Sequence, residues 1–222
     1  MKEQLNQRVD GERLHRCLVP VFKNSYTREK LESQSESYLL TAEILERDHL
    51  SDYSEVSNVA IITSIASNYC KIFEYELSCS IDHLIRRKLS IELPEYYYKY
   101  QNGKKAFFYS QDRTNFEIDY NKKNRAFYFK DKDWFPVSTG ASLVVISEMI
   151  NRGEFDELKD FFTSEQLDVL KEVGEEIKNI RNVCAHSIID LEQLSRVKNG
   201  LTELESKGVF EGMFKIKALL KA

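Results

Sequence analysis

The chain has 222 residues, of which 42% are hydrophobic, 12% aromatic and 31% charged. This composition supplies apolar surface for a sizeable core and excludes an intrinsically disordered chain. The formal net charge of −4 excludes a general electrostatic attraction to nucleic acid, so any contact with RNA requires a local basic patch.

Glycine and proline are scarce, with 8 and 3 residues respectively, which favours long helices over an all-β fold with its frequent turns. The four cysteines form no C-x-x-C pair and no metal-finger spacing. We therefore expect reduced thiols, no metal or other cofactor, and a cytoplasmic protein. The first residues lack the apolar core of a signal peptide, and no run reaches the roughly 18 apolar residues of a membrane span, so we expect no membrane association.

The chain begins with a polar segment, residues 1–26, that contains the short apolar run CLVPVF. We predict that this segment is an N-terminal arm that docks onto the body of the protein. An amphipathic helix follows, with a cap at Ser25 or Thr27 and apolar residues at near-helical spacing up to about Asp48.

The clearest helical pattern runs from Ser54 to about Ile91, a stretch without glycine or proline. Apolar residues recur there every three or four positions, which predicts one long helix or two nearly collinear helices that end before Pro94. The basic run at 86–88 suits the negative end of the helix dipole.

Residues 93–135 differ in character, because they mix aromatic residues with Lys, Arg and Asn. The Asn-Gly pair at 102–103 predicts a turn, and the runs KKAFFYS and RAFYFKD are typical of short strands. We predict a small aromatic and basic insertion, for which a β-hairpin is one form. Such a surface is typical of single-strand binding, but a hairpin that packs its aromatic residues on the body and exposes its lysines explains the pattern as well.

Helical patterns resume after Pro136, and we predict five further helices, at 138–153, 154–162, 165–186, 190–207 and 209–221. The fold class is therefore an all-α, up-and-down helical bundle. Residues 27–222 are predicted to form a single domain that includes the insertion.

The stretch IKNIRNVCAHSIID, residues 177–190, carries Arg181, Asn182 and His186 within an apolar helical pattern. At about 100° per residue, Asn182 and His186 share nearly one helix face, whereas Arg181 and His186 lie about 140° apart. A polar helix end explains these residues without any function, because Arg181 would pair with a glutamate and His186 would meet the negative end of the dipole. Spacing alone favours this structural explanation.

Two carboxylates and one thiol could act together with these three residues. Glu74 or Glu76 on the long helix could position Arg181, although we expect both carboxylates to be exposed. Cys184 is two residues from His186, about 200° away on a helix, so the two side chains point apart and we do not expect a cysteine nucleophile.

The segment RNVCAH resembles the R-N-x-x-x-H motif of the HEPN superfamily, in which a four- or five-helix bundle carries an arginine and a histidine four to six residues apart late in the chain. The small residue before the histidine is similar to the abortive-infection (Abi-like) branch, as is the upstream run DWFPVSTGASLVVISEMINRGEFDELKDFF. The resemblance covers roughly residues 134–190 and, more loosely, the long helix. The N-terminal arm and the 93–135 segment depart from the pattern.

The resemblance implies a metal-independent endoribonuclease, a toxin or phage-defence protein that works as a homodimer and is paired with an antitoxin protein. His186 would be the base that removes the 2′-hydroxyl proton, because an imidazole exchanges protons near neutral pH. Arg181 would hold the phosphate as it gathers negative charge. Asn182 would orient the imidazole or bind a phosphate oxygen, and a capping role for it is equally open.

RNA would also contact basic residues outside the motif, for which the candidates are Arg86, Arg87, Lys122, Lys123 and Arg125. The alternative reading is a HEPN-like helical bundle that cleaves nothing and acts as a protein- or nucleotide-binding module. The intact Arg–Asn–His set favours the enzyme, and the acidic net charge favours the binding module.

Overall fold

The structure is a computed structural model, and it describes residues 20–50, 57–85, 96–101, 104–109, 118–120, 123–125, 139–151 and 156–221. The chain divides into two compact units. The first unit comprises Met1–Glu76 and Glu165–Glu211, and the second comprises Leu77–Ser164 and Gly212–Ala222. That residues 27–222 form a single domain stays a prediction.

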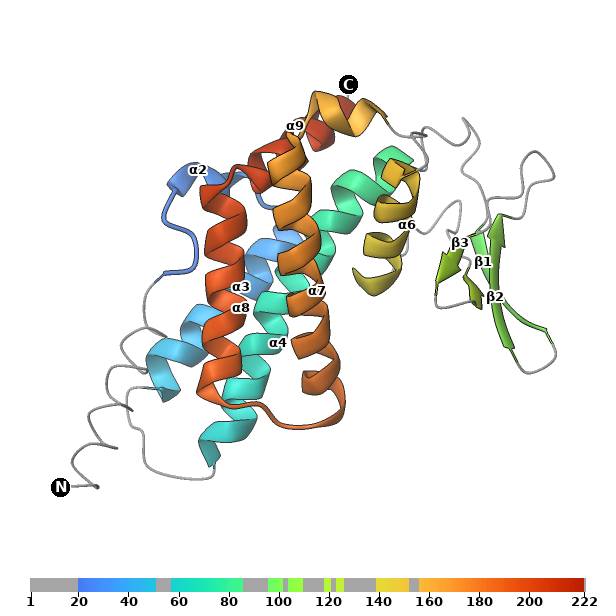
Figure 1. Cartoon of the computed structure of the whole chain (residues 1–222). Helices are drawn as coiled ribbons and strands as arrows, with labels where there is room; N and C mark the ends of the chain where they lie inside the picture. The colour runs from blue at the N-terminus through green and yellow to red at the C-terminus, as the bar shows by residue number, and fades with distance from the viewer. Residues whose placement is uncertain are drawn as a thin grey trace. The chain divides into compact units, whose positions relative to one another are not determined.

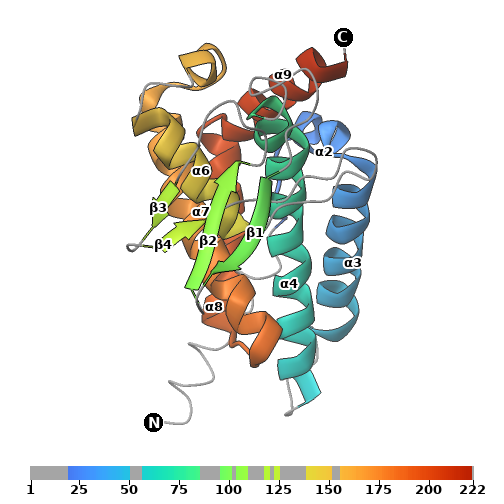
Figure 2. The same ribbon diagram turned by 90° about the vertical axis from the view of Figure 1, so that its right-hand side faces the viewer.

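The first unit is a bundle of helices that come from two separate stretches of the chain. Its helices are α2 (Ser25–Lys30), α3 (Ser33–His49), α4 (Ser57–Leu77), α7 (Ser164–His186) and α8 (Leu191–Ser206), and it also contains the first turn of α9 (Val209–Lys221). Figure 1 shows α3, α4, α7 and α8 side by side, and Figure 2 shows the neighbouring pair α3 and α4 from another side. The predicted helical bundle is confirmed for this part of the chain.

The α7–α8 pair illustrates how the sequence produces this packing. Buried apolar residues recur every three or four positions along α7, at Leu167, Leu170, Val173, Ile177 and Ile180. Helix α8 begins at a capping box, in which the Gln193 backbone N–H donates to Asp190 Oδ1 at 2.8 Å and the Asp190 N–H donates to Gln193 Oε1 at 3.2 Å. The two helices approach closely at Gly200, where a Cβ atom would lie 2.9 Å from Val173 Cγ1.

The core of the first unit contains an ion pair. Lys198 Nζ on α8 donates to Glu46 Oε1 and Oε2 on α3 at 2.8 and 3.0 Å, and the two side chains are 5% and 7% exposed. The same ammonium lies 5.5 Å from the ring centroid of Tyr69 on α4. Burial raises the pKa of the Glu46 carboxyl, although the Lys198 charge acts in the opposite direction. The pair therefore links α3, α4 and α8, although removing both charges from water costs free energy.

The predicted first helix is wrong as a single element, because the chain breaks between α2 and α3. Leu31 and Glu32 have extended backbones there, and the Glu32 N–H donates to the buried Glu76 carboxylate on α4 at 2.8 Å. Asn24, not Ser25 or Thr27, caps α2 by accepting from the Tyr26 N–H at 2.9 Å.

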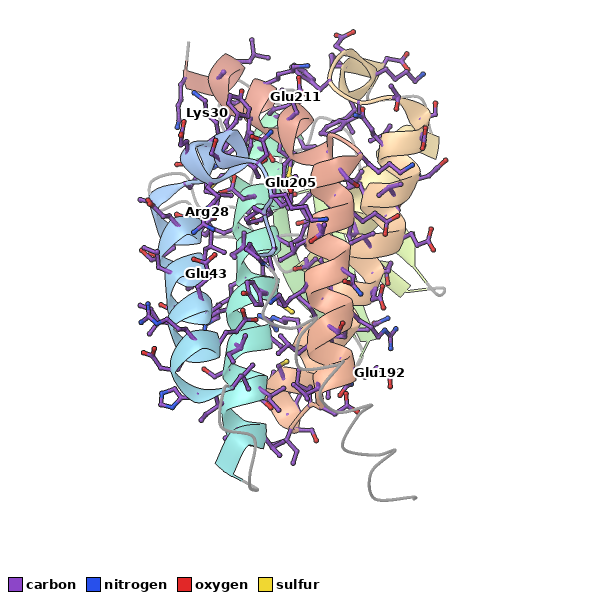
Figure 3. All side chains as sticks on the ribbon, turned by 90° about the vertical axis from the view of Figure 1, so that its left-hand side faces the viewer. Arg28, Lys30, Glu43, Glu192, Glu205 and Glu211 are labelled. Carbon is purple, nitrogen blue, oxygen red and sulfur yellow. The ribbon has the colours of Figure 1, made fainter. Side chains whose placement is uncertain are left out.

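A bidentate ion pair joins the two helices that result from this break. Both Arg28 terminal nitrogens on α2 donate to the Glu43 carboxylate on α3 at 2.8 Å (Figure 3). Two parallel hydrogen bonds fix the planar guanidinium relative to the planar carboxylate. The pair therefore keeps α2 against α3, although the chain changes direction between the two helices.

The described end of the N-terminal arm docks on α8, as expected for the arm as a whole. Val21 and Phe22 are buried, and the Thr202 hydroxyl donates to the Val21 carbonyl at 2.8 Å. The backbone N–H groups of Lys23 and Asn24 donate to the Glu205 carboxylate at 2.9 and 3.2 Å. Residues 1–19 lie outside the described residues.

The second unit contains the rest of the predicted long helix. Helix α4 continues into a π-helical turn, η1 (Ser78–Asp82), and the described helix ends at Ile85. Asp82 is buried and accepts from the Ser78 hydroxyl at 3.2 Å and from the Ser142 hydroxyl at 2.7 Å. Ser142 belongs to α6 (Thr139–Asn151), so the carboxylate joins the two helices. The helix predicted at 154–162 is observed as a 3₁₀ helix, η2 (Asp156–Asp160).

Four short strands lie within the 93–135 segment. They are β1 (Tyr96–Gln101), β2 (Lys104–Tyr109), β3 (Ile118–Tyr120) and β4 (Lys123–Arg125). β1 pairs antiparallel with β2, and β3 pairs antiparallel with β4. The run KKAFFYS corresponds to β2, whereas most of RAFYFKD lies outside the described residues. That this segment is an insertion in a helical fold stays a prediction. Among the helices in the described ranges, none combines the length and apolar character needed to cross a lipid bilayer.

Candidate helix-end site

Arg181 lies on the face of α7 that packs against α4. It follows Ile177 by one turn, and the Ile177 carbonyl accepts from Cys70 Sγ of α4 at 3.8 Å. The Arg181 side chain is 41% exposed, and its Nε atom is 3.6 Å from Glu74 Oε2 of α4. This separation is that of an ion pair and exceeds that of a hydrogen bond. Glu74 therefore restrains the guanidinium by charge.

The expectation that Glu74 and Glu76 are exposed is wrong. The Glu74 side chain is only 14% exposed and lies beside Arg181, and Glu76 is fully buried beneath the backbone of Glu32. The reason is tertiary: α4 is central in the first unit, with partners on more than one side, so carboxylates on it meet positive groups and N–H donors instead of water.

Asn182 and His186 both lie on the exposed surface of α7. His186 is the last residue of the helix, and the Ser187 N–H donates to the Val183 carbonyl at 2.7 Å, so the backbone itself closes the final turn. A capping role for Asn182 stays a prediction. Neither side chain is sealed in the core, so both can meet a ligand or a partner.

The Arg181 and His186 side chains of the motif therefore point in different directions. Arg181 turns toward α4 and Glu74, whereas His186 faces solvent at the end of α7, in agreement with their angular separation of about 140°. The structural explanation of the motif is also satisfied, because Arg181 does pair with a glutamate and His186 does lie at the negative end of a helix. A single protomer thus presents the two groups separately.

The other sequence-predicted RNA contacts are only partly placed. Arg86, Arg87 and Lys122 lie outside the described residues. Lys123 and Arg125 belong to β4, where they pair with Tyr120 and Ile118 of β3 respectively. Their contribution to RNA binding stays a prediction.

Charge varies along α7. The first half of the helix exposes the carboxylates of Glu165, Asp168 and Glu172, whereas the last turns carry Arg181 and His186.

A recess with both apolar and polar lining residues, which the sequence did not predict, lies next to the motif. It has a volume of about 260 Å³ and is lined by Val59, Ile62, Ile188, Ile189, Asp190, Leu191 and Gln193. Ile188, two residues after His186, is 65% exposed, whereas the adjacent Ile189 is buried. In the sequence, the signal for an exposed apolar side chain here was the pair Ile188 and Ile189 directly after a polar helix end. Only one of two consecutive side chains can face the core, so the other one is exposed.

The thiol of Cys184 lies in a partly buried position. Burial raises its pKa, although the nearby Arg181 charge acts in the opposite direction, so the thiolate is disfavoured. Within the described part of the chain, no three His, Cys, Asp or Glu side chains cluster as a metal site requires.

The fold and the site together define a helical bundle with an arginine, an asparagine and a histidine at one helix end. Compared with known proteins, the chain matches no protein family, no curated protein and no solved structure. The resemblance to the HEPN superfamily therefore stays a prediction from the sequence around residues 181–186.

Proposed function

We propose that this chain is a HEPN-type, metal-independent endoribonuclease, a toxin or phage-defence protein of the abortive-infection kind. The observation that carries the proposal is the state of Arg181: its guanidinium is held 3.6 Å from a shielded carboxylate, is 41% exposed, and lies in the same helix end as an exposed histidine. A restrained and partly exposed guanidinium is suited to bind a phosphate.

The reaction would proceed by attack of the RNA on itself. His186 takes the proton of the 2′-hydroxyl, and the 2′-oxygen attacks the adjacent phosphorus as the bond to the 5′-oxygen breaks. The leaving 5′-oxygen takes up a proton, so the products are a 2′,3′-cyclic phosphate and a 5′-hydroxyl. Arg181 stabilises the charge on the pentacovalent phosphate, and Asn182 orients the imidazole or binds a phosphate oxygen.

A homodimer would bring the separated groups together. Because Arg181 and His186 diverge within one protomer, a two-fold axis near the end of α7 could place the histidine of one copy opposite the arginine of the other. Two-fold dimers are the most common assembly of identical chains. An antitoxin protein that covers this helix end would then silence both copies of the motif. Lys123 and Arg125 of β4, together with Arg86, Arg87 and Lys122, are the proposed further RNA contacts.

The second candidate is a bundle that binds a protein or a nucleotide and cleaves nothing. It is favoured by the Arg181–Glu74 pair, which explains the arginine without catalysis, and by the net charge of −4. The two candidates differ in a simple observable, because only the enzyme shortens RNA.

The test is RNA cleavage by the purified full chain in the presence of EDTA. We expect wild type to cleave, and Arg181→Ala and His186→Ala each to lose at least about 100-fold in rate. Matched controls are Arg196→Ala on α8 and His49→Ala at the end of α3, which remove an exposed arginine and an exposed histidine elsewhere in the first unit. Cleavage that survives both motif substitutions would refute the proposal, and RNA binding without cleavage by wild type would favour the second candidate.

A further inference from the structure

One exposed face of α7 carries two amide side chains in line with the histidine of the motif. Asn179, Asn182 and His186 are three and four residues apart, so they lie within about 60° of one another around the helix axis. All three residues are exposed. Asn179 lies about 10 Å from His186 along the axis and about 20° from it around the axis. The row of polar groups therefore extends from the motif toward the middle of the helix.

The side chains of this row have no partner among the described residues, where none of the three forms a hydrogen bond or an ion pair. Their neighbours Glu176 and Arg181 differ, because they pair with Arg196 on α8 and Glu74 on α4. Asparagine is also among the less favourable residues in a helix interior, since its amide competes for backbone hydrogen bonds. Asn179 is too far from either end of α7 to act as a cap. Among the described contacts, no gain in stability explains an asparagine at this position.

We propose that Asn179 selects the RNA sequence that is cleaved, by binding an adenine base next to the cleaved phosphodiester; this inference rests on the proposed function. A side-chain amide presents a donor and an acceptor side by side. The Asn179 Nδ2–H group can donate to adenine N7 while Oδ1 accepts from adenine N6, and the N7 edge of guanine offers two acceptors instead. With the attacked sugar at His186, the adjacent base can extend along the helix to Asn179.

The contact requires a single-stranded RNA. In an A-form RNA duplex, the base edges that carry N7 line a deep and narrow major groove, which side chains cannot read. An unpaired base can turn the same edge toward the exposed surface of α7. We therefore expect cleavage in loops and unpaired segments, next to an adenine, and none inside a duplex.

The first experiment maps the sites at which the full chain cleaves a random-sequence single-stranded RNA. We expect wild type to favour adenine at one fixed position beside the cleaved bond, and Asn179→Ala to lose this preference. On a substrate with adenine at that position, the rate should fall by roughly 5- to 150-fold in Asn179→Ala. On the same substrate with uracil there, the variant and wild type should cleave at equal rates.

The matched control is Asn199→Ala on α8, which removes an exposed asparagine elsewhere in the first unit and should keep the adenine preference. Asn179→Gln retains the amide and should keep part of the preference. The midpoint of thermal unfolding should rise by about 1–2 °C in Asn179→Ala, because alanine is the better helix former. Cleavage by wild type without an adenine preference, or a preference that survives Asn179→Ala, would overturn the inference.

The second experiment measures binding without cleavage, by fluorescence anisotropy with short oligodeoxyadenylate and oligothymidylate strands, which lack the attacking 2′-hydroxyl. We expect wild type to bind the adenine strand more tightly by roughly 5- to 150-fold, and Asn179→Ala to bind both strands equally. An adenine preference in binding, without any RNA cleavage by wild type, would refute the proposed function alone. Cleavage that depends on His186 but is indifferent to adenine would overturn this inference alone, and a wild type that neither cleaves RNA nor prefers adenine would overturn both.

Discussion

Replacing Lys198 with methionine would leave the Glu46 carboxylate buried without its counter-ion. The two nitrogen–oxygen distances of 2.8 and 3.0 Å correspond to a gross attraction of about 6 kcal/mol at an effective dielectric constant of about 20. Most of that attraction offsets the cost of removing both charges from water. The loss of one partner exposes the full desolvation cost of the other, so we expect Lys198→Met to lower the free energy of unfolding by about 3–5 kcal/mol at pH 7.

The pH dependence of this variant follows from the Glu46 carboxyl. Burial already raises its pKa in the folded protein, and removal of the Lys198 charge should raise it further. The folded state then binds a proton more tightly than the unfolded state, so stability is favoured below the unfolded pKa and is lost as the pH rises through the folded pKa. The destabilisation should therefore be smaller near pH 4 than at pH 7.

The assay is urea unfolding followed by circular dichroism, applied to a double-mutant cycle. We expect Glu46→Leu combined with Lys198→Met to recover most of the stability lost in Lys198→Met, because two apolar side chains replace two buried charges. The exposed pair Arg196–Glu176 is the control, and Arg196→Met should cost less than about 1 kcal/mol. A loss below about 1 kcal/mol in Lys198→Met, or a double variant less stable than both single variants, would refute this account of the core.

Three further substitutions test other contacts. Glu74→Gln removes the charge that restrains Arg181. We expect the kcat of RNA cleavage to fall by about 10- to 100-fold, with little change in thermal unfolding. An unchanged kcat would show that Glu74 does not position the arginine. Asp190→Ala removes the cap of α8 and should cost about 1 kcal/mol in urea unfolding, whereas Asp190→Asn, which keeps a capping oxygen, should cost less. Gly200→Leu should cost about 1–3 kcal/mol, since a side chain there would collide with Val173, and combining it with Val173→Ala should recover part of the loss if that contact is the cause.

Helix positions were readable from the sequence because local chemistry sets them. The three- and four-residue apolar spacing of α7 predicted its buried face, and the residues Asp190 and Gln193 that begin α8 form their capping box within four residues. The split of the motif also followed from helix geometry alone, since the rotation per residue separates Arg181 from His186 wherever the helix lies. The 3.6-residue repeat of the helix was therefore enough to place these elements.

Partners across helices were decided by tertiary structure. At the break between α2 and α3, the Glu32 backbone is held by the carboxylate of Glu76, 44 residues away in the chain. The sequence around Leu31 and Glu32 does not predict this contact. As charged residues, Glu46 and Lys198 look like surface residues in the sequence. They form a buried pair because α3 and α8 meet there, although the two residues lie 152 positions apart in the chain. Burial of a charged group depends on the neighbours that surround it, and the identity of those neighbours is a property of packing, which hydrophobic periodicity along one helix does not encode.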